Sequence, residues 1–356
     1  MTAASLQRSV RPGRLPSRIG VQGQRASNRP LAAAIVAAVL GLLALAPPPA
    51  ARAADVVGIA DQGARMFSDP FFAALDVRVS RLIVSYDAVL RRTFEVADVE
   101  AWLTAAEQAG VEPLIAFNHS RGCYDGRGVV RRSSCRLPSV ERYVQAVEAF
   151  RRRFPQARVL TAWNEANHRS QPTARNPRRA AAFYNALRSR CPGCRVVAAD
   201  VLDQAGVQDW LRTFKRHARG TPGLWGLHNY QDTNNFTSST TRAVLKLVRG
   251  EVWLTETGGI VRFGRRRPFD PERAAEATAY MFRLAASSPR ITRLYIYQWS
   301  GVARSERFDA GLMTPAGRPR PAYYVVRRRL ARPGGNPGPR TALPACAPGL
   351  TQPCAG

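Results

Sequence analysis

The chain has 356 residues, and its 53 basic residues against 25 acidic ones give a formal net charge of +28. Only two of the basic residues are lysines, and the arginines are scattered over segments expected to be helix faces, without interleaved aromatic residues. Because single-stranded nucleic-acid sites combine cations with aromatic platforms, the pattern indicates solvated surface charge and excludes nucleic acid as the expected partner.

The first 54 residues have the order of a secretory signal. Six arginines and no acid occupy the first 30 positions, the apolar run Leu31–Leu45 follows, and small residues lead up to Ala53. The run is shorter than the about 20 residues that a membrane span needs. A signal cleaved near Ala53 or Ala54 is therefore predicted, with an uncleaved anchor as the alternative. The mature protein is expected to be secreted, monomeric and without stable membrane insertion.

Residues 55–332 alternate short β-branched runs with amphipathic segments. Helix starts are predicted at Ser139, at Asp270-Pro271-Glu272 and at Pro321, which combine capping residues with first-turn prolines. The predicted strands are Val56–Ala60, Val79–Ser85, Glu112–Phe117, Arg158–Asn164, Arg195–Asp200, Leu224–Asn229, Glu251–Glu256 and Thr292–Gln298. Eight strand–helix units favour an α/β fold with a single (β/α)8 TIM barrel, which typically takes about 250 residues.

A doubly wound open sheet is the competing architecture. It would ordinarily show a Gly-rich phosphate loop after the first strand, and Gly58-Ile-Ala-Asp-Gln-Gly63 lacks that spacing. The expected organisation is a signal over residues 1–54, the barrel over 55–332, and a Pro/Gly-rich tail over 333–356.

The six cysteines fall into close pairs, as suits an exported protein. Cys191-Pro-Gly-Cys194 follows a predicted helix instead of opening one, unlike a redox pair, and no further ligands at zinc spacing are evident. We therefore prefer three local disulfides, although six cysteines allow fifteen connectivities. The expected pairs are Cys123–Cys135, Cys191–Cys194 and Cys346–Cys354.

Catalytic side chains of a (β/α)8 barrel lie where strands end and loops begin. Two predicted strands run from apolar residues into an acid, the fourth in Trp163-Asn164-Glu165 and the seventh in Glu256. The third, sixth and eighth end in His119, His228-Asn-Tyr230 and Gln298-Trp299-Ser300. A single acid at a strand end is usually a solvated charge. Two acids at one mouth, beside an aromatic residue, suit hydrolysis of a glycosidic bond.

These motifs resemble those of the clan A glycoside hydrolases, the barrel group of cellulases, β-mannanases and β-xylosidases, over the whole barrel. The resemblance implies Glu165 as general acid/base and Glu256 as nucleophile of a retaining double displacement. It also implies a set of substrate-binding roles. These fall to Asn164 at the sugar 2-hydroxyl, Arg81 keeping the nucleophile ionised, His228 and Tyr230 beside the nucleophile, Trp299 as sugar platform and His119 as a further sugar contact.

The sequence departs from the clan pattern where Ala166 replaces a common proline and where Thr257-Gly-Gly259 follows the nucleophile, which is expected to widen the subsite. The charge of Glu256 is expected to raise the pKa of Glu165 so that it can donate a proton. By the resemblance, the peptide bond after Trp299 is expected to be cis, with the indole facing Glu256. Asp200 and Asp203 either assist or cap the next helix.

The expected partner is a carbohydrate, and no cofactor is required. No metal is expected, because His168 near Glu165 belongs to no ligand set at metal spacing. The non-enzymatic alternative is a secreted barrel that binds cell-surface or acidic glycans without cleaving them. Two facing acids argue against it, because a binding module has no use for them.

Overall fold

The structure, a computed structural model, describes residues 56–123 and 135–331. The barrel strands are β1 Val56–Ala60, β2 Val79–Ser85, β3 Glu112–Asn118, β4 Val159–Thr161, β5 Arg195–Val197, β6 Asp200–Leu202, β7 Leu224–His228, β8 Glu251–Thr257 and β10 Ile291–Tyr297. The helices are η2 Ala64–Ser68, α2 Pro70–Ala73, α3 Glu95–Gln108, α4 Val140–Arg153, α5 Pro177–Arg190, α6 Val207–His217, α7 Tyr230–Asn234, α8 Ser239–Leu247, α9 Pro271–Ala286 and α10 Pro321–Leu330. A search of these ranges finds no helix with the length and apolar character to cross a membrane.

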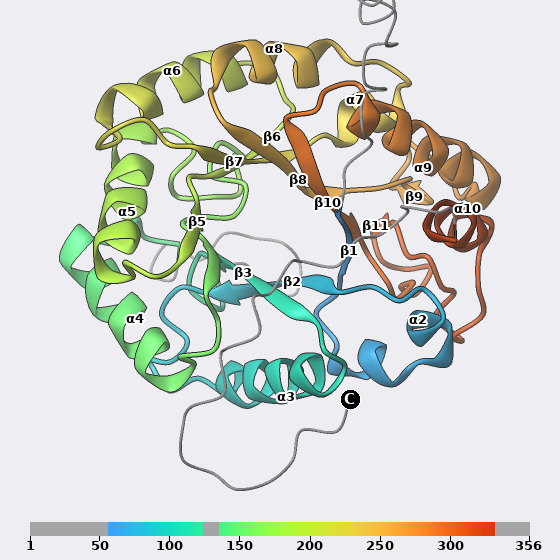
Figure 1. Cartoon of the computed structure of the whole chain (residues 1–356), viewed down its shortest axis with the longest axis horizontal. Coiled ribbons are helices and arrows are strands. Elements are labelled where there is room, and N and C mark those ends of the chain that lie inside the picture. The colour runs from blue at the N-terminus through green and yellow to red at the C-terminus, as the bar shows by residue number, and fades with distance from the viewer. Residues whose placement is uncertain (1–55, 124–134, 332–356) are drawn as a thin grey trace, which may run out of the picture. The chain divides into compact units, whose positions relative to one another are not determined.

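The strands form one parallel sheet in the order β5-β4-β3-β2-β1-β10-β8-β7-β6. Because β5 and β6 are successive stretches of a single passage, interrupted at Ala198 and Ala199, the nine segments make eight passages that close on themselves. Figure 1 shows the helices arranged around the strands. The predicted single (β/α)8 barrel is confirmed, and all eight predicted strands are present, the fifth in two pieces.

Local sequence signals fix the helix starts. The side chain of Ser139 accepts a hydrogen bond from Arg142 N (3.1 Å) at α4, and Asp270 accepts one from Arg273 N (2.9 Å) at α9. These caps satisfy main-chain donors that the first turn leaves unpaired. Helices α9 and α10 each have a proline in their first turn, and α10 begins at Pro321 as predicted.

The barrel interior changes from apolar to polar along the strands. A small cluster separate from the main core takes one residue from each of seven strands, namely Val56, Val79, Leu114, Val159, Val197, Trp253 and Tyr295. Side chains two positions apart in a strand share a face, so Arg81 lies on the same face of β2 as Val79 and one layer further along. The main core lies between strands and helices and includes Trp102, Trp163 and Trp225.

Two of the three predicted disulfides are confirmed. Cys123 and Cys135 are bonded with their Cα atoms 4.5 Å apart, and Cys191 and Cys194 with theirs 5.3 Å apart. Cys346 and Cys354 lie outside the described residues. The bonded pair at Cys191 follows α5, which ends at Arg190, as the sequence predicts.

A small second sheet joins two loops of the barrel. Strands β9 (Arg262–Phe263) and β11 (Phe308–Asp309) pair antiparallel in the loops that follow β8 and β10. Their two-residue length gives too short a pattern for sequence periodicity to detect.

Candidate active site

Arg81 stands at the centre of the site. Its side chain is buried, with Nη1 donating to Glu256 Oε2 (2.8 Å) and Nη2 donating to Asn164 Oδ1 (2.6 Å) and Asp200 Oδ2 (2.9 Å). The same Nη2 lies 3.4 Å from His228 Nε2. Burial lowers the pKa of Arg81, but the charges of Asp200 and Glu256 outweigh it and raise that pKa. One guanidinium therefore fixes groups from the ends of four strands.

A bulge in β8 turns Glu256 toward Arg81. An advance of two residues along β7 pairs with an advance of three along β8. An advance of two residues along β10 likewise pairs with three along β8. The matching pairs are Gly226 with Trp253, His228 with Glu256, Leu294 with Leu254 and Ile296 with Thr257. Side chains of a strand alternate between its two faces, and an extra residue reverses which of them point to the barrel interior beyond the bulge. Both Thr255 and Glu256 consequently bond to interior groups, Thr255 Oγ1 donating to Asp200 Oδ1 (2.8 Å).

Tyr230 holds the other oxygen of Glu256. Its hydroxyl donates to Glu256 Oε1 (3.1 Å), and burial followed by the charge of Glu256 raises the pKa of Tyr230 well above its usual value. Tyr230 begins α7, whose first amides are capped by Asp203, which accepts from Gln231 N (3.0 Å) and Asp232 N (2.8 Å). Asp203 therefore caps α7, and not the next helix in the chain, α6, whose N-cap is Gly206.

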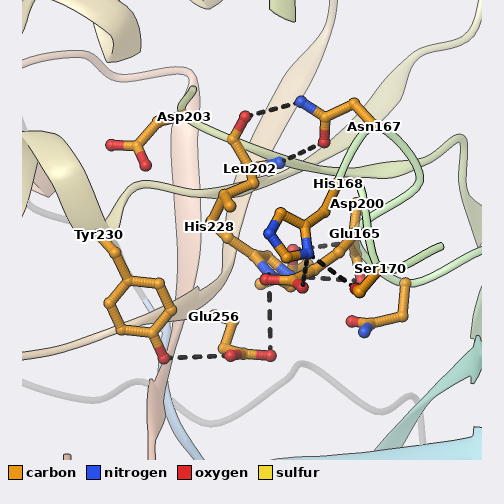
Figure 2. A network of polar contacts seen from close by, with 12 residues as sticks. Glu165, Asn167, His168, Ser170, Asp200, Leu202, Asp203, His228, Tyr230 and Glu256 are labelled. Atoms are coloured by element: carbon orange, nitrogen blue, oxygen red, sulfur yellow. Dashed lines mark hydrogen bonds and ion pairs between the residues drawn. The ribbon is translucent and has the colours of Figure 1, made fainter. Parts of the chain in front are cut away.

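Glu165 lies between two imidazoles (Figure 2). Its Oε1 is 3.3 Å from His228 Nδ1, and its Oε2 is 3.7 Å from His168 Nδ1. The backbone of Glu165 has φ +44°, a conformation uncommon outside glycine that persists where the surroundings impose it. Those surroundings include Asn167, whose side chain bonds to both the amide and the carbonyl of Leu202 (2.8 and 2.9 Å).

His228 connects the two acids. Nδ1 lies 3.3 Å from Glu165 Oε1 and 3.8 Å from Glu256 Oε2, while Nε2 lies 3.6 Å from Asp200 Oδ2. Burial lowers the pKa of His228, but the charge of Glu256 and the bonds to Asp200 and Glu165 raise it to about 9. A pKa of about 9 leaves the imidazole protonated at neutral pH.

The expected direction of the Glu165 pKa is wrong. Burial raises it, but the hydrogen bond and charge of His228, followed by His168 and Arg81, lower it below its ordinary value. Sequence reasoning counted the negative charge of Glu256 and could not place the imidazole of His228 at 3.3 Å from Glu165.

The two acids approach closely. One oxygen of each and a ring nitrogen of His228 all lie within 4.8 Å of one another, so these three could in principle surround a cation. In the described part of the chain this is the one such group found. The guanidinium of Arg81, already bonded to Glu256, opposes the binding of a second positive charge there.

The expectation for Trp299 is wrong. The indole is 3% exposed and packs edge-on against Phe72 (5.6 Å) and Tyr323 (6.1 Å), with Nε1 3.3 Å from Asp69 Oδ2. It belongs to the core between α2, α10 and the barrel. The cis bond is Tyr297–Gln298, two residues earlier than predicted. Strand β10 ends at Tyr297, one residue before the predicted end at Gln298.

Tyr297 takes the position at the strand end that was expected for Trp299. It shares a face of β10 with Tyr295 of the interior cluster, and burial, followed by the charges of Glu256 and Asp61, raises its pKa. The alternation Arg293-Leu-Tyr295-Ile-Tyr297 carries the signal that could have found it. Asp200, which the sequence left undecided, is wholly buried at the start of β6, within the fifth passage.

His119 follows β3 and is half-buried. Its Nδ1 lies 3.0 Å from Ser120 O, and burial lowers its pKa. Its role as a sugar contact stays a prediction.

A family model described as the glycosyl hydrolase catalytic core matches residues 138–322. Similar solved structures include the GH5_18 enzyme of Streptomyces cattleya in complex with Manb1-4GlcNAc, at 17% identity over 82% of each chain with a TM-score of 0.57. A monomeric beta-xylosidase from Caulobacter crescentus is 14% identical over 78% of this chain and 68% of its own, with a TM-score of 0.56.

Xylanase 10B from Thermotoga maritima is 11% identical over 77% of this chain and 94% of its own, with a TM-score of 0.53. A search of curated protein sequences gives no match. At such identities the solved structures show a shared fold, while the family match covers more than half of the chain. The chain is therefore a glycosidase with the barrel of the clan A glycoside hydrolases, and it belongs to the glycosyl hydrolase catalytic core family.

Proposed function

We propose that the protein is a secreted, retaining glycosidase that cleaves O-glycosidic bonds of a poly- or oligosaccharide, with Glu256 as nucleophile and Glu165 as acid/base. The observation that carries this is the approach of the two carboxylates, whose nearest oxygens lie within 4.8 Å. Retaining enzymes keep their carboxyl groups about 5–5.5 Å apart, whereas inverting enzymes need about 6.5–9.5 Å to admit water. An oxygen–oxygen approach within 4.8 Å allows the carboxyl separation of the retaining class, and direct attack is proposed on that basis.

The two acids have different surroundings, which supports different roles. Glu256 accepts from Arg81 and Tyr230, two donors that stabilise a carboxylate ready to attack the anomeric carbon. Among the described residues no guanidinium or phenol donates to Glu165, which instead adjoins protonated His228. In our proposal the proton that leaves with the aglycone comes from this Glu165–His228 pair. It returns there when Glu165 deprotonates the water that releases the sugar.

The proposed sugar contacts are Asn164 and Tyr297. Asn164 is held by Arg81 beside the nucleophile, where it can reach a 2-hydroxyl. Tyr297 takes over the platform role first assigned to Trp299, because it ends β10 on the same face as Tyr295 of the interior cluster, and the charge of Glu256 contributes to its raised pKa. Secretion is supported by the two disulfides, since such bonds persist in oxidising compartments.

The test is the stereochemistry of products from single variants with added azide. Substrates are aryl glycosides, xylan and Manβ1-4GlcNAc, chosen because the structural neighbours are named for xylan-type and mannose-containing ligands. Glu256→Ala should lose turnover, and azide should restore it with inverted anomeric configuration, because azide then attacks directly. Glu165→Ala should keep activity on activated aryl groups and give glycosyl azide of retained configuration.

The matched control is Glu251→Ala. Glu251 lies at the opposite end of the same strand as Glu256, bonded to Thr292 Oγ1 and Trp253 Nε1. Residues at that end of a barrel strand contribute stability and not chemistry, so its turnover should stay near wild type. Turnover by Glu256→Ala without azide, or inversion by the wild type, would refute the retaining assignment. Binding of glycans without any hydrolysis would support the non-enzymatic alternative.

A further inference from the structure

An arginine-rich unit lies next to the site. It comprises residues 262–267 and 303–309, which contain β9 and β11 and are here called the arginine unit. Its acidic residues are Glu306, which is exposed, and Asp309, which is buried and paired with Arg320 (2.8 Å). Its six arginines are Arg262, Arg265, Arg266, Arg267, Arg304 and Arg307.

Main-chain bonds fix the two halves of the arginine unit to each other. Val261 N donates to Asp309 O (2.8 Å), and Gly264 N donates to Arg307 O (2.8 Å). The guanidinium of Arg262 adds bonds to Ala303 O (2.9 Å) and to the carbonyl of Arg304. These bonds fix the two loops that carry the arginines relative to each other.

Aromatic packing joins the arginine unit to the site. The ring of Phe308 stacks on Tyr297 (centroids 6.3 Å apart) and meets the edges of Tyr230 (5.8 Å) and Phe263 (5.9 Å). Arg307 in turn lies over the ring of Phe263 (5.0 Å). Tyr230 is the residue that donates to Glu256. The arginine unit therefore packs directly against the site through Phe308.

The charge of the arginine unit is uncompensated. Within residues 56–123 and 135–331 none of its six guanidinium groups pairs with a carboxylate, although Arg81, Arg293 and Arg320 elsewhere all do. Arg265 and Arg266 are exposed, and neither side chain has a polar partner in those ranges. Gathering like charges costs self-repulsion, and this gathering follows the strand ends where barrels bind substrates.

We propose that the arginine unit binds the carboxylate or sulfate groups of an acidic glycan whose backbone is cleaved between Glu165 and Glu256. The inference rests on the proposed function. A guanidinium can donate two parallel hydrogen bonds to two oxygens of a carboxylate or of a tetrahedral oxyanion such as sulfate. The rings of Phe263, Phe308 and Tyr230 lie between Arg307 and Glu256, and the carboxylates of the site repel an anion beside them. The acidic groups therefore belong to sugars adjacent to the cleaved one.

The experiment measures binding without cleavage, in the Glu256→Gln background. The test variant adds Arg265→Gln and Arg266→Gln. The control variant adds Arg152→Gln and Arg242→Gln, two exposed arginines of α4 and α8 that also lack a polar side-chain partner in the described chain. Both variants remove two charges. Circular dichroism and the thermal midpoint check that each is folded.

The probes are polygalacturonate for carboxylates, dextran sulfate for sulfates, neutral dextran, and single-stranded DNA as a non-glycan polyanion. We expect tighter binding of one or both acidic polymers than of dextran. The test variant should lose about tenfold in affinity at low salt, as for two exposed charge contacts, and less at about 0.15 M. The control variant should stay within about twofold, in keeping with charges far from the site.

Equal losses in both variants, equal binding of neutral dextran, or DNA bound as tightly with the same loss would overturn the proposal. Wild-type hydrolysis of aryl glycosides separates the two inferences. If hydrolysis is absent while the arginine-dependent binding is present, the proposed function fails and the anionic subsite stands. If hydrolysis is present without that binding, only the subsite fails.

Discussion

The charged side chains of the site do not balance one another. Three carboxylates, Glu165, Glu256 and Asp200, face the two cations Arg81 and protonated His228. The remaining negative charge is useful, because the transition state of glycoside hydrolysis resembles an oxocarbenium ion and its positive charge is stabilised by preorganised anions. Because negative charge is in excess, loss of either cation is expected to destabilise the site.

Arg81→Lys tests the dependence on the guanidinium shape. Lysine keeps the charge but cannot direct two nitrogens to Glu256, Asn164 and Asp200 at once. We expect a loss of about 1–3 kcal/mol in the free energy of unfolding and of roughly 100-fold in kcat/KM. Denaturant titration and initial rates measure these.

The control for this change is Arg78→Lys, three residues earlier. Arg78 pairs with Asp76 at 2.5 Å, and both side chains are largely exposed. Exposed pairs contribute about 0–1 kcal/mol, so this variant should differ little from wild type. Equal effects of the two variants would contradict the central role of Arg81.

The protonation of His228 predicts how stability depends on pH. Its folded pKa of about 9 lies above the usual value near 6.5, so its contribution is complete below that usual value. It is lost as pH rises through 9, because the folded state then gives up a proton that it holds more tightly than the unfolded chain. The free energy of unfolding should fall from pH 7 to about 9.5, and His228→Gln should flatten that decline. A decline of the same slope in the variant would assign it to other groups.

At the scale of elements, β7 and β8 shape the site by two local irregularities. The bulge of β8 turns Glu256 inward, and Gly226 of β7 leaves room for Asp200. A Cβ at Gly226 would lie 1.9 Å from Asp200 Oδ1 and 2.6 Å from Thr255 Oγ1. The strand therefore needs a residue without a side chain at this point of close approach.

Gly226→Ala is expected to displace Asp200 and, through it, Arg81. Overpacking of this kind costs about 1–3 kcal/mol of stability, and kcat/KM should fall with it. The control is Gly223→Ala, just before β7, where an added Cβ meets nothing within 4 Å and φ is not left-handed. That change should be neutral or slightly stabilising. Full activity in Gly226→Ala would show that Asp200 can move without consequence.

At the scale of the whole molecule, net positive charge opposes folding, because the +28 of the full chain stays at +21 without the seven arginines of the expected signal. Compact states concentrate like charges, and added salt screens their repulsion. The exposed ion pairs, such as Arg153–Glu100 and Arg212–Asp209, contribute too little to reverse this effect.

Raising sodium chloride from low ionic strength to about 0.2 M should therefore increase the thermal midpoint, as the Debye length falls below 10 Å. The rise should be about 2–4 °C, equivalent to about 1 kcal/mol. Differential scanning calorimetry measures it, with an equal osmolality of sucrose as control for excluded-cosolute effects. A midpoint that falls with salt would mean that surface pairs dominate.

Much of the architecture could be predicted because it is encoded locally. Strand positions follow from β-branched runs, and the starts of α4 and α9 follow from Ser139 and Asp270, whose caps act within three residues. The pairings Cys123–Cys135 and Cys191–Cys194 are local in the same sense. The acids Glu165 and Glu256 were found because both interrupt apolar runs at strand ends.

Only the tertiary structure decided which face each strand-end residue presents and which charges meet. The register of β10 sends Trp299 into the core and Tyr297 toward the site, and neighbouring strands, not the sequence of β10 alone, set that register. The low pKa of Glu165 likewise depends on His228, which is 63 residues away in the chain and 3.3 Å away in space. The sequence by itself determined the elements and the candidate acids, because propensity and capping act over a few residues. Electrostatic coupling acts through distances that only folding creates.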